Sequence, residues 1–402
     1  MYKSLVQYLG FNVLVLLLGF LLLPLLSNVI DPSEYGKVGI YLAIVALIQP
    51  FIGMSSESLV QVKKHRLNDK GYNGFVSNIY FVSLLCFFVS VLFLQCYYGF
   101  DAKYSSEVLL LVSFIGLTRF LINVRLMEYT IEGKAVLFGL ARFGVKFSAV
   151  LILTGCLFFS YSPDNKLYML ILLVSELSVI VFFVSERAGL LIRSWNVSLA
   201  SIKEIFKFGL PIMLSTLPLW VLNEYGKFAL QGVSLSAVGY FVFAKQLSMV
   251  YVQVCASVAN AFVSRVLGES SKRALFKIFI ISTSAYALLL ILYVIFFSLL
   301  SDIVVGDRFS DSIELFHILL AGSFCQVLAT IPSQLIAREG KTRFLLISAV
   351  LSSLVFLFLS HIYFQEISAV NIAFSFVFGM AAYACFMWFF TLIGIIRYEF
   401  SD

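Results

Sequence analysis

Four basic residues stand inside long apolar segments of the sequence, where charged side chains are unusual. They are Arg119, Arg142, Lys146 and Lys245. An ionisable group at the depth of a bilayer core costs about 2.5 to 3.5 kcal/mol on insertion scales, so it normally faces a protein interior or a water-filled cavity. A helical rise of 1.5 Å per residue places these groups roughly 12 to 18 Å from the nearer end of their segments. Arg142 and Lys146 are one helical turn apart on one face, and their mutual repulsion favours an anion in front of them.

Acidic residues at comparable depth are fewer. Glu176 is the deepest acid, and we expect it to pair with Arg119 or Arg142 and to act as a gate. The same pair could simply hold two helices together, and without a neighbouring cation Glu176 would exchange protons instead. Glu224 and Lys227 are three residues apart, which is compatible with a local ion pair or with a functional one.

Two further groups of residues are expected to be structural or mechanical. We expect Arg125 to extend to the membrane surface and Glu128 to lie near the inner end of the same segment. Pro211 and Pro218, two turns apart in one segment, predict a kinked helix that serves as a bending point. The three histidines have no metal-ligand spacing and no glycine-rich nucleotide motif is present, so neither a metal nor a cofactor is expected.

The segments that must position these residues are membrane spans. The chain has 402 residues, of which 61% are apolar and only 12% are charged, about half the charge content of a soluble protein. This composition excludes a water-soluble fold and indicates an all-α polytopic membrane protein. Twelve segments are long and apolar enough to span a bilayer: 9–30, 38–56, 75–98, 108–131, 135–160, 167–192, 208–231, 237–264, 278–300, 315–337, 344–364 and 370–396.

Basic residues are distributed unevenly among the connecting loops. One side of the membrane receives 18 Lys and Arg and the other receives four. The positive-inside rule therefore places both termini and the loop 62–74 in the cytoplasm. This asymmetry explains the basic excess of the chain without a nucleic-acid partner.

The sequence contains an internal duplication. The segment 30–36 between the first two spans corresponds to 233–239 between spans seven and eight, at an offset of 203 residues. The Glu-Gly-Lys tripeptides that end at Lys134 and Lys341 repeat with an offset of 207. We therefore expect two six-helix halves, 1–195 and 208–402, joined by a cytoplasmic linker, 196–207. Parallel repeats of this kind are typical of secondary transporters, whose substrate path lies between the halves.

Several short motifs resemble those of one transporter family. Asp31-Pro32-Ser33-Glu34-Tyr35-Gly36 resembles the Pro-Glu-x-Tyr-Gly signature between the first two helices of polysaccharide flippases. The stretch 208–215, followed by Trp220 and by Val238-Gly239-Tyr240, is similar to their helices seven and eight. Members often carry an Asp-Arg pair late in helix seven, where this chain has Gly226-Lys227. The chain thus resembles the Wzx-type O-antigen and polysaccharide flippases of the multidrug/oligosaccharidyl-lipid/polysaccharide (MOP) superfamily.

The resemblance implies a fold, a substrate and a location. The fold would be the V-shaped transporter fold of MATE and MurJ proteins. The substrate would be an undecaprenyl-diphosphate-linked oligosaccharide, moved from the cytoplasmic to the periplasmic leaflet of the bacterial inner membrane by alternating access through a cationic central cavity. Proton or sodium coupling and a polysaccharide polymerase partner would follow, and the chain would not be an enzyme. Five cations would line the cavity: Arg119, Arg142, Lys146, Lys227 and Lys245.

Other functions remain open at this point. A cation-coupled multidrug exporter of the same superfamily would use carboxylates in its cavity, whereas the charges in these spans are mainly basic. An O-antigen polymerase would carry a large outer loop with catalytic basic residues, but the longest outer loop, 301–314, contains only Arg308. A lipid II flippase would have additional C-terminal helices. A membrane scaffold would have no use for several mid-span cations.

Overall fold

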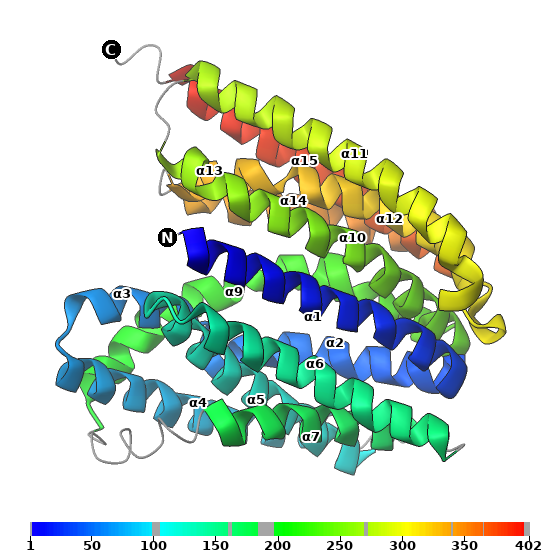
Figure 1. Cartoon of the computed structure of the whole chain (residues 1–402), viewed down its shortest axis with the longest axis horizontal. Coiled ribbons are helices and arrows are strands. Elements are labelled where there is room, and N and C mark those ends of the chain that lie inside the picture. The colour runs from blue at the N-terminus through cyan, green and yellow to red at the C-terminus, as the bar shows by residue number, and fades with distance from the viewer. Residues whose placement is uncertain are drawn as a thin grey trace. The chain divides into compact units, whose positions relative to one another are not determined.

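The structure is a computed structural model that describes residues 2–98, 105–159, 163–183, 197–268, 272–338, 341–364 and 366–397. Every regular element in these ranges is a helix (Figure 1). The α-helices are α1 (Tyr2–Val29), α2 (Pro32–Gly53), α3 (Glu57–Arg66), α4 (Asp69–Tyr98), α5 (Ser106–Ile131), α6 (Ala135–Phe158), α7 (Asn165–Phe183), α9 (Leu199–Gln231), α10 (Leu235–Gly268), α11 (Lys272–Val304), α12 (Ser312–Leu328), α13 (Thr330–Arg338), α14 (Thr342–Phe358) and α15 (Ala369–Arg397).

These helices confirm the predicted class of protein. Eleven helical segments in the described part of the chain are long and apolar enough to cross a membrane, and α12 and α13 together form one of them. The N-terminal helix α1 adds a further apolar stretch, Val13–Val29. The chain is therefore an all-α, multi-pass membrane protein, with eleven such segments and the apolar helix α1 among its described residues.

The helices form two compact units. Unit 1 comprises Met1–Leu25 and Val38–Leu217, and unit 2 comprises Leu26–Lys37 and Pro218–Asp402. The division inside α9 thus falls at Pro218, one of the two prolines expected to form a bending point. The helix α9 begins at Leu199, so residues 199–207 of the expected linker are its first turns. The expected end of the first half, residue 195, lies outside the described residues.

Small residues allow the helices of unit 1 to pack closely. The helix α5 packs against α3, α4, α6 and α7, and α6 also packs against α7. Gly116 on α5 faces Ile48 and Ile52 of α2, and Gly144 on α6 faces Val179 of α7. In lipid, apolar side chains gain little by leaving their solvent, so close van der Waals packing at such small residues stabilises the bundle.

In unit 2, the two segments identified as an internal duplication pack against each other. A Cβ atom at Gly36 would overlap the carbonyl oxygen of Leu235, and a Cβ atom at Gly239 would overlap the carbonyl oxygen of Pro32. Each glycine therefore lies on the backbone four residues before the other glycine. Only a residue without a side chain permits this reciprocal approach of α2 and α10.

The connection between α2 and α4 differs from the prediction. The expected loop 62–74 is largely helical, because α3 extends to Arg66 and α4 starts at Asp69. The Oδ1 atom of Asn68 accepts a hydrogen bond from the backbone N–H of Gly71 at 2.8 Å and thereby caps α4. The charge-rich sequence of this stretch concealed a short polar helix.

Candidate functional site

The buried acid Glu176 forms the centre of a polar cluster in unit 1. It is 3% exposed on α7, and its Oε1 atom accepts a hydrogen bond from Nε of Arg119 on α5 at 2.8 Å. Its second oxygen accepts a hydrogen bond from the hydroxyl of Thr118. The structure thus confirms pairing of Glu176 with Arg119, one of the two partners expected. The contribution of Thr118 was missed, because a hydroxyl beside a predicted cation gives no sequence signal of its own.

The helix α6 presents two more cations to the same cluster. Arg142 and Lys146 are both solvent-accessible, and the same helix face continues to Ala149 and Leu153, which are 4% and 1% exposed. At 100° per residue, this face lies roughly 80 to 180° from the exposed apolar side chains of α6. Those apolar side chains are Val136, Leu140, Phe147, Leu151 and Phe158. Arg142 and Lys146 therefore project away from the face that suits lipid contact.

This cluster contains more basic than acidic residues. Lys146 lies within electrostatic range of Arg119, Arg142 and Glu176. Glu176 pairs with Arg119, and Arg142 and Lys146 on α6 bring the cluster to three cations and one acid. We name Arg119, Arg142, Lys146 and Glu176 the unit 1 cluster. Its net positive charge suits a ligand with at least two negative charges.

A second polar cluster lies in unit 2. Lys227 and Glu224 on α9 form an ion pair, as their spacing allowed. Lys245 on α10 does not join this pair, and its Nζ atom donates a hydrogen bond to the backbone carbonyl of Asn223. We name Glu224, Lys227 and Lys245 the unit 2 cluster. The nine predicted site residues thus fall into two clusters and two prolines, with Pro211 in unit 1 and Pro218 in unit 2.

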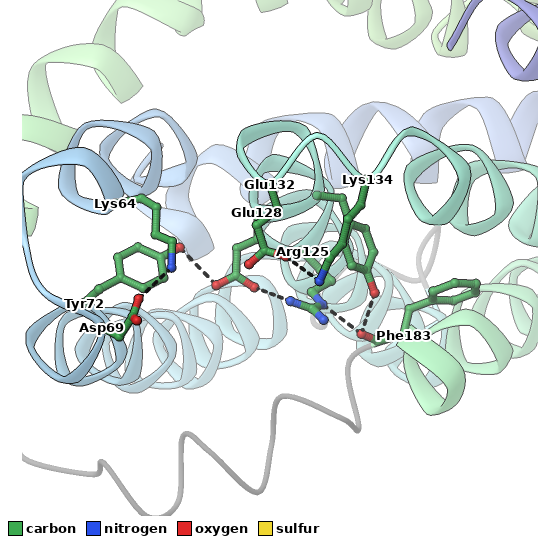
Figure 2. A network of polar contacts seen from close by, with 9 residues as sticks. Lys64, Asp69, Tyr72, Arg125, Glu128, Glu132, Lys134 and Phe183 are labelled. Atoms are coloured by element: carbon green, nitrogen blue, oxygen red, sulfur yellow. Dashed lines mark hydrogen bonds and ion pairs between the residues drawn. The ribbon is translucent and has the colours of Figure 1, made fainter. Parts of the chain in front are cut away.

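A third set of polar residues joins the ends of several helices in unit 1 (Figure 2). Arg125 and Glu128 on α5 are 7% and 1% exposed and form an ion pair of 2.8 Å. Glu128 also accepts a hydrogen bond from the hydroxyl of Tyr72 on α4 at 3.0 Å. Nε of Arg125 donates to the carbonyl oxygen of Phe183 at 3.0 Å. We name these four residues the Arg125 network.

The Arg125 network corrects the expectation for Arg125. This side chain does not extend to the membrane surface but turns inward, where its guanidinium caps a carbonyl at the end of α7. Tyr129 strengthens the arrangement, because its ring lies 4.3 Å from the guanidinium carbon and its hydroxyl donates to the same carbonyl. Because α4, α5 and α7 are all joined here, the network is a structural brace. The exposed pair Lys64–Asp69 lies beside it in Figure 2.

Nothing in the described part of the chain forms a metal site. No group of three or more His, Cys, Asp or Glu residues within these ranges is placed to hold a metal ion.

Comparison with solved structures defines the class of protein. An inward-facing multidrug resistance MATE transporter of the MOP superfamily superimposes with a TM-score of 0.76, at 13% identity and covering 99% of both chains. The lipid II flippase MurJ, in an inward closed conformation, gives 0.73 at 12% identity, covering 97% of this chain and 87% of that one. An outward-facing MATE transporter gives 0.65 at 16% identity, covering 100% and 97%. The fold is that of MOP superfamily transporters.

The sequence itself identifies the family. Residues 2–263 match the family described as "Polysaccharide biosynthesis protein", and the chain belongs to that family. A search of curated proteins found no match.

Proposed function

We propose that the protein translocates an undecaprenyl-diphosphate-linked oligosaccharide across the bacterial cytoplasmic membrane by alternating access. The observation that carries the proposal is the excess of cations in the unit 1 cluster, on a helix face turned away from lipid. A diphosphate has the complementary charge, and its polyprenyl tail can remain in lipid while the headgroup crosses. The polysaccharide biosynthesis family supports a substrate of this kind.

The residues of the unit 1 cluster have distinct roles in this proposal. Arg142 binds diphosphate oxygens with its planar fork, and Lys146 contributes a point charge beside it. Glu176 holds the guanidinium of Arg119 in place and limits the positive charge of the site. Pro218, at the division between the units, is the proposed bending point, and Pro211 lies two turns before it.

The family and fold support a transporter rather than an enzyme, and we propose further that both termini are cytoplasmic. Coupling to protons or sodium and an association with a polysaccharide polymerase belong to the same proposal. The MATE fold keeps a multidrug exporter as the second candidate. Such an exporter would carry cationic compounds, which the excess positive charge of the unit 1 cluster disfavours.

The proposal is tested with purified protein in proteoliposomes, using a fluorescent undecaprenyl-diphosphate disaccharide as the probe. Lys146→Gln removes one charge-assisted contact worth about 1.5 to 3 kcal/mol, so flipping should slow by roughly 10- to 100-fold. Lys166→Gln is the matched control, because Lys166 is exposed and pairs with Glu107, which is not part of the unit 1 cluster. The control should flip the probe at the wild-type rate.

Two results would contradict the proposal. Wild-type protein that does not flip the probe but extrudes a cationic dye such as ethidium would establish the exporter instead. Equal flipping by Lys146→Gln and wild type would remove the unit 1 cluster from substrate binding.

A further inference from the structure

Lys245 is a buried ammonium group that no carboxylate contacts directly. It is 7% exposed, and its hydrogen bonds go to the backbone carbonyl of Asn223 and, at 3.4 Å, to the amide Oδ1 of the same residue. Its Nζ atom also lies 4.4 Å from the centre of the Phe376 ring on α15. All three partners are neutral. Dipoles and an aromatic face therefore hold this charge in the interior of unit 2.

The charged groups near Lys245 are one acid and one base that pair with each other. Within the described residues, those that act on its ammonium are Glu224 and Lys227, both on α9. These two form an ion pair with each other, so Lys227 partly offsets the effect of Glu224 on Lys245. The other helices that contact α10 include α2, α11, α12, α13 and α15, and among their described residues no further charged group acts on Lys245.

In the part of the chain that the structure describes, no ion pair with a carboxylate holds the proton on Lys245. Burial without a countercharge disfavours the ammonium form, whereas two oxygen acceptors and the ring of Phe376 favour it. A neutral amine still has two N–H groups, so it can donate to the oxygen atoms of Asn223 after the proton is lost. Glu176 differs from Lys245 in its partners, because Arg119 and Thr118 both donate hydrogen bonds to its carboxylate.

We propose that Lys245 is the proton-exchange site of the transport cycle, an inference that rests on the proposed function. In each cycle its ammonium releases one proton to water on one side of the membrane and, as an amine, takes up one proton from water on the other side. The ligand of the site is the proton itself. No covalent bond other than N–H changes.

The experiment measures how probe flipping responds to a pH gradient. Proteoliposomes flip the fluorescent undecaprenyl-diphosphate disaccharide with and without a gradient of about one pH unit, applied in either direction. Such a gradient changes a step coupled to one proton by up to about tenfold, and we expect a change of this order for the wild type. Lys245→Arg stays charged and Lys245→Met stays neutral, so both should flip the probe at a rate that ignores the gradient. Lys166→Met, an exposed lysine, is the matched control and should respond like the wild type.

A second measurement does not depend on transport. Wild type and Lys245→Met, each in detergent and confirmed as monodisperse, are titrated between about pH 6 and pH 9. We expect the wild type to take up about one proton per chain more than the variant. If Lys245→Met does not fold, Lys245→Gln replaces it in both experiments.

The outcomes separate the two proposals. Equal gradient responses in wild type and both Lys245 variants, or equal proton uptake in the titration, would overturn the role of Lys245. A wild type that flips no probe would refute the proposed function, and the titration then decides alone whether Lys245 exchanges protons.

Discussion

Arg119 and Glu176 form a partly buried ion pair inside the unit 1 cluster. Arg142 and Lys146 on α6 add two further cations to the unit 1 cluster. Charges in a low-dielectric interior interact strongly, so an anionic headgroup gains more there than at an exposed surface. Lys146 lies near other charged groups, whereas Lys245 has neutral partners. This difference is the reason for proposing a binding role for Lys146 and a proton-exchange role for Lys245.

The Arg125 network makes a prediction about stability at the same scale. Glu128→Gln keeps the shape of the side chain but leaves the guanidinium of Arg125 buried without its carboxylate. Breaking a buried pair in this way should lower the free energy of unfolding by about 3 to 5 kcal/mol. The measurement is thermal unfolding in detergent, followed by tryptophan fluorescence.

Asp69→Asn is the matched control for this prediction. It breaks the pair Lys64–Asp69, in which the Asp69 side chain is 91% exposed, and an exposed pair contributes at most about 1 kcal/mol. Similar losses of stability in the two variants would show that the Arg125 network is not a brace.

At the scale of elements, glycines decide which helices touch. The reciprocal contact of Gly36 and Gly239 joins the start of α2 to the start of α10 inside unit 2. Tyr35 supports the contact, because its hydroxyl donates to Oε1 of Gln246 at 2.6 Å and its ring packs edge-on against Phe309. The duplicated segments therefore act as a matched pair of packing surfaces.

Gly239→Ala tests this contact. The new methyl group would overlap the carbonyl oxygen of Pro32, and overpacking of a close backbone contact costs about 1 to 3 kcal/mol. We expect a lower unfolding temperature and weaker probe flipping.

The control for Gly239→Ala is Gly155→Ala on α6. A Cβ atom at Gly155 would meet nothing within 4 Å, and alanine in a helix is favoured over glycine by up to about 1 kcal/mol. This variant should be as stable as the wild type or more stable. Equal destabilisation by both substitutions would mean that helix propensity, and not the contact with Pro32, governs the result.

For the whole molecule, the uneven distribution of basic residues among the loops predicts its orientation in the membrane. The connection between α3 and α4 should face the cytoplasm and the turn after α11 should face outward. Both sites offer exposed residues, Lys70 and Ser310, that can be replaced by cysteine. Asn68 is less suitable because it caps α4.

The labelling experiment uses a background in which the six native cysteines are replaced. In intact cells, a membrane-impermeant maleimide should label Ser310→Cys but not Lys70→Cys, and it should label both after the membrane is opened. Labelling of Lys70→Cys in intact cells would contradict the predicted orientation.

The sequence determined the class, the spans and the candidate charges of this protein. A span of apolar residues can be read locally, because a bilayer imposes a minimum length and excludes uncompensated charge. For the same reason, Arg119, Arg142, Lys146 and Lys245 stood out as mid-span cations. The positions of the duplicated segments followed from their repeated spacing.

Only the tertiary structure decided which charges neutralise one another. Arg119 binds Glu176, Arg125 turns inward to Phe183, and Lys245 has neutral hydrogen-bond partners. These outcomes depend on side chains that lie 22 to 58 residues apart in the chain but adjacent in space. Helix rotation and close packing at glycines bring them together, and neither quantity is fixed by the local pattern of apolar residues.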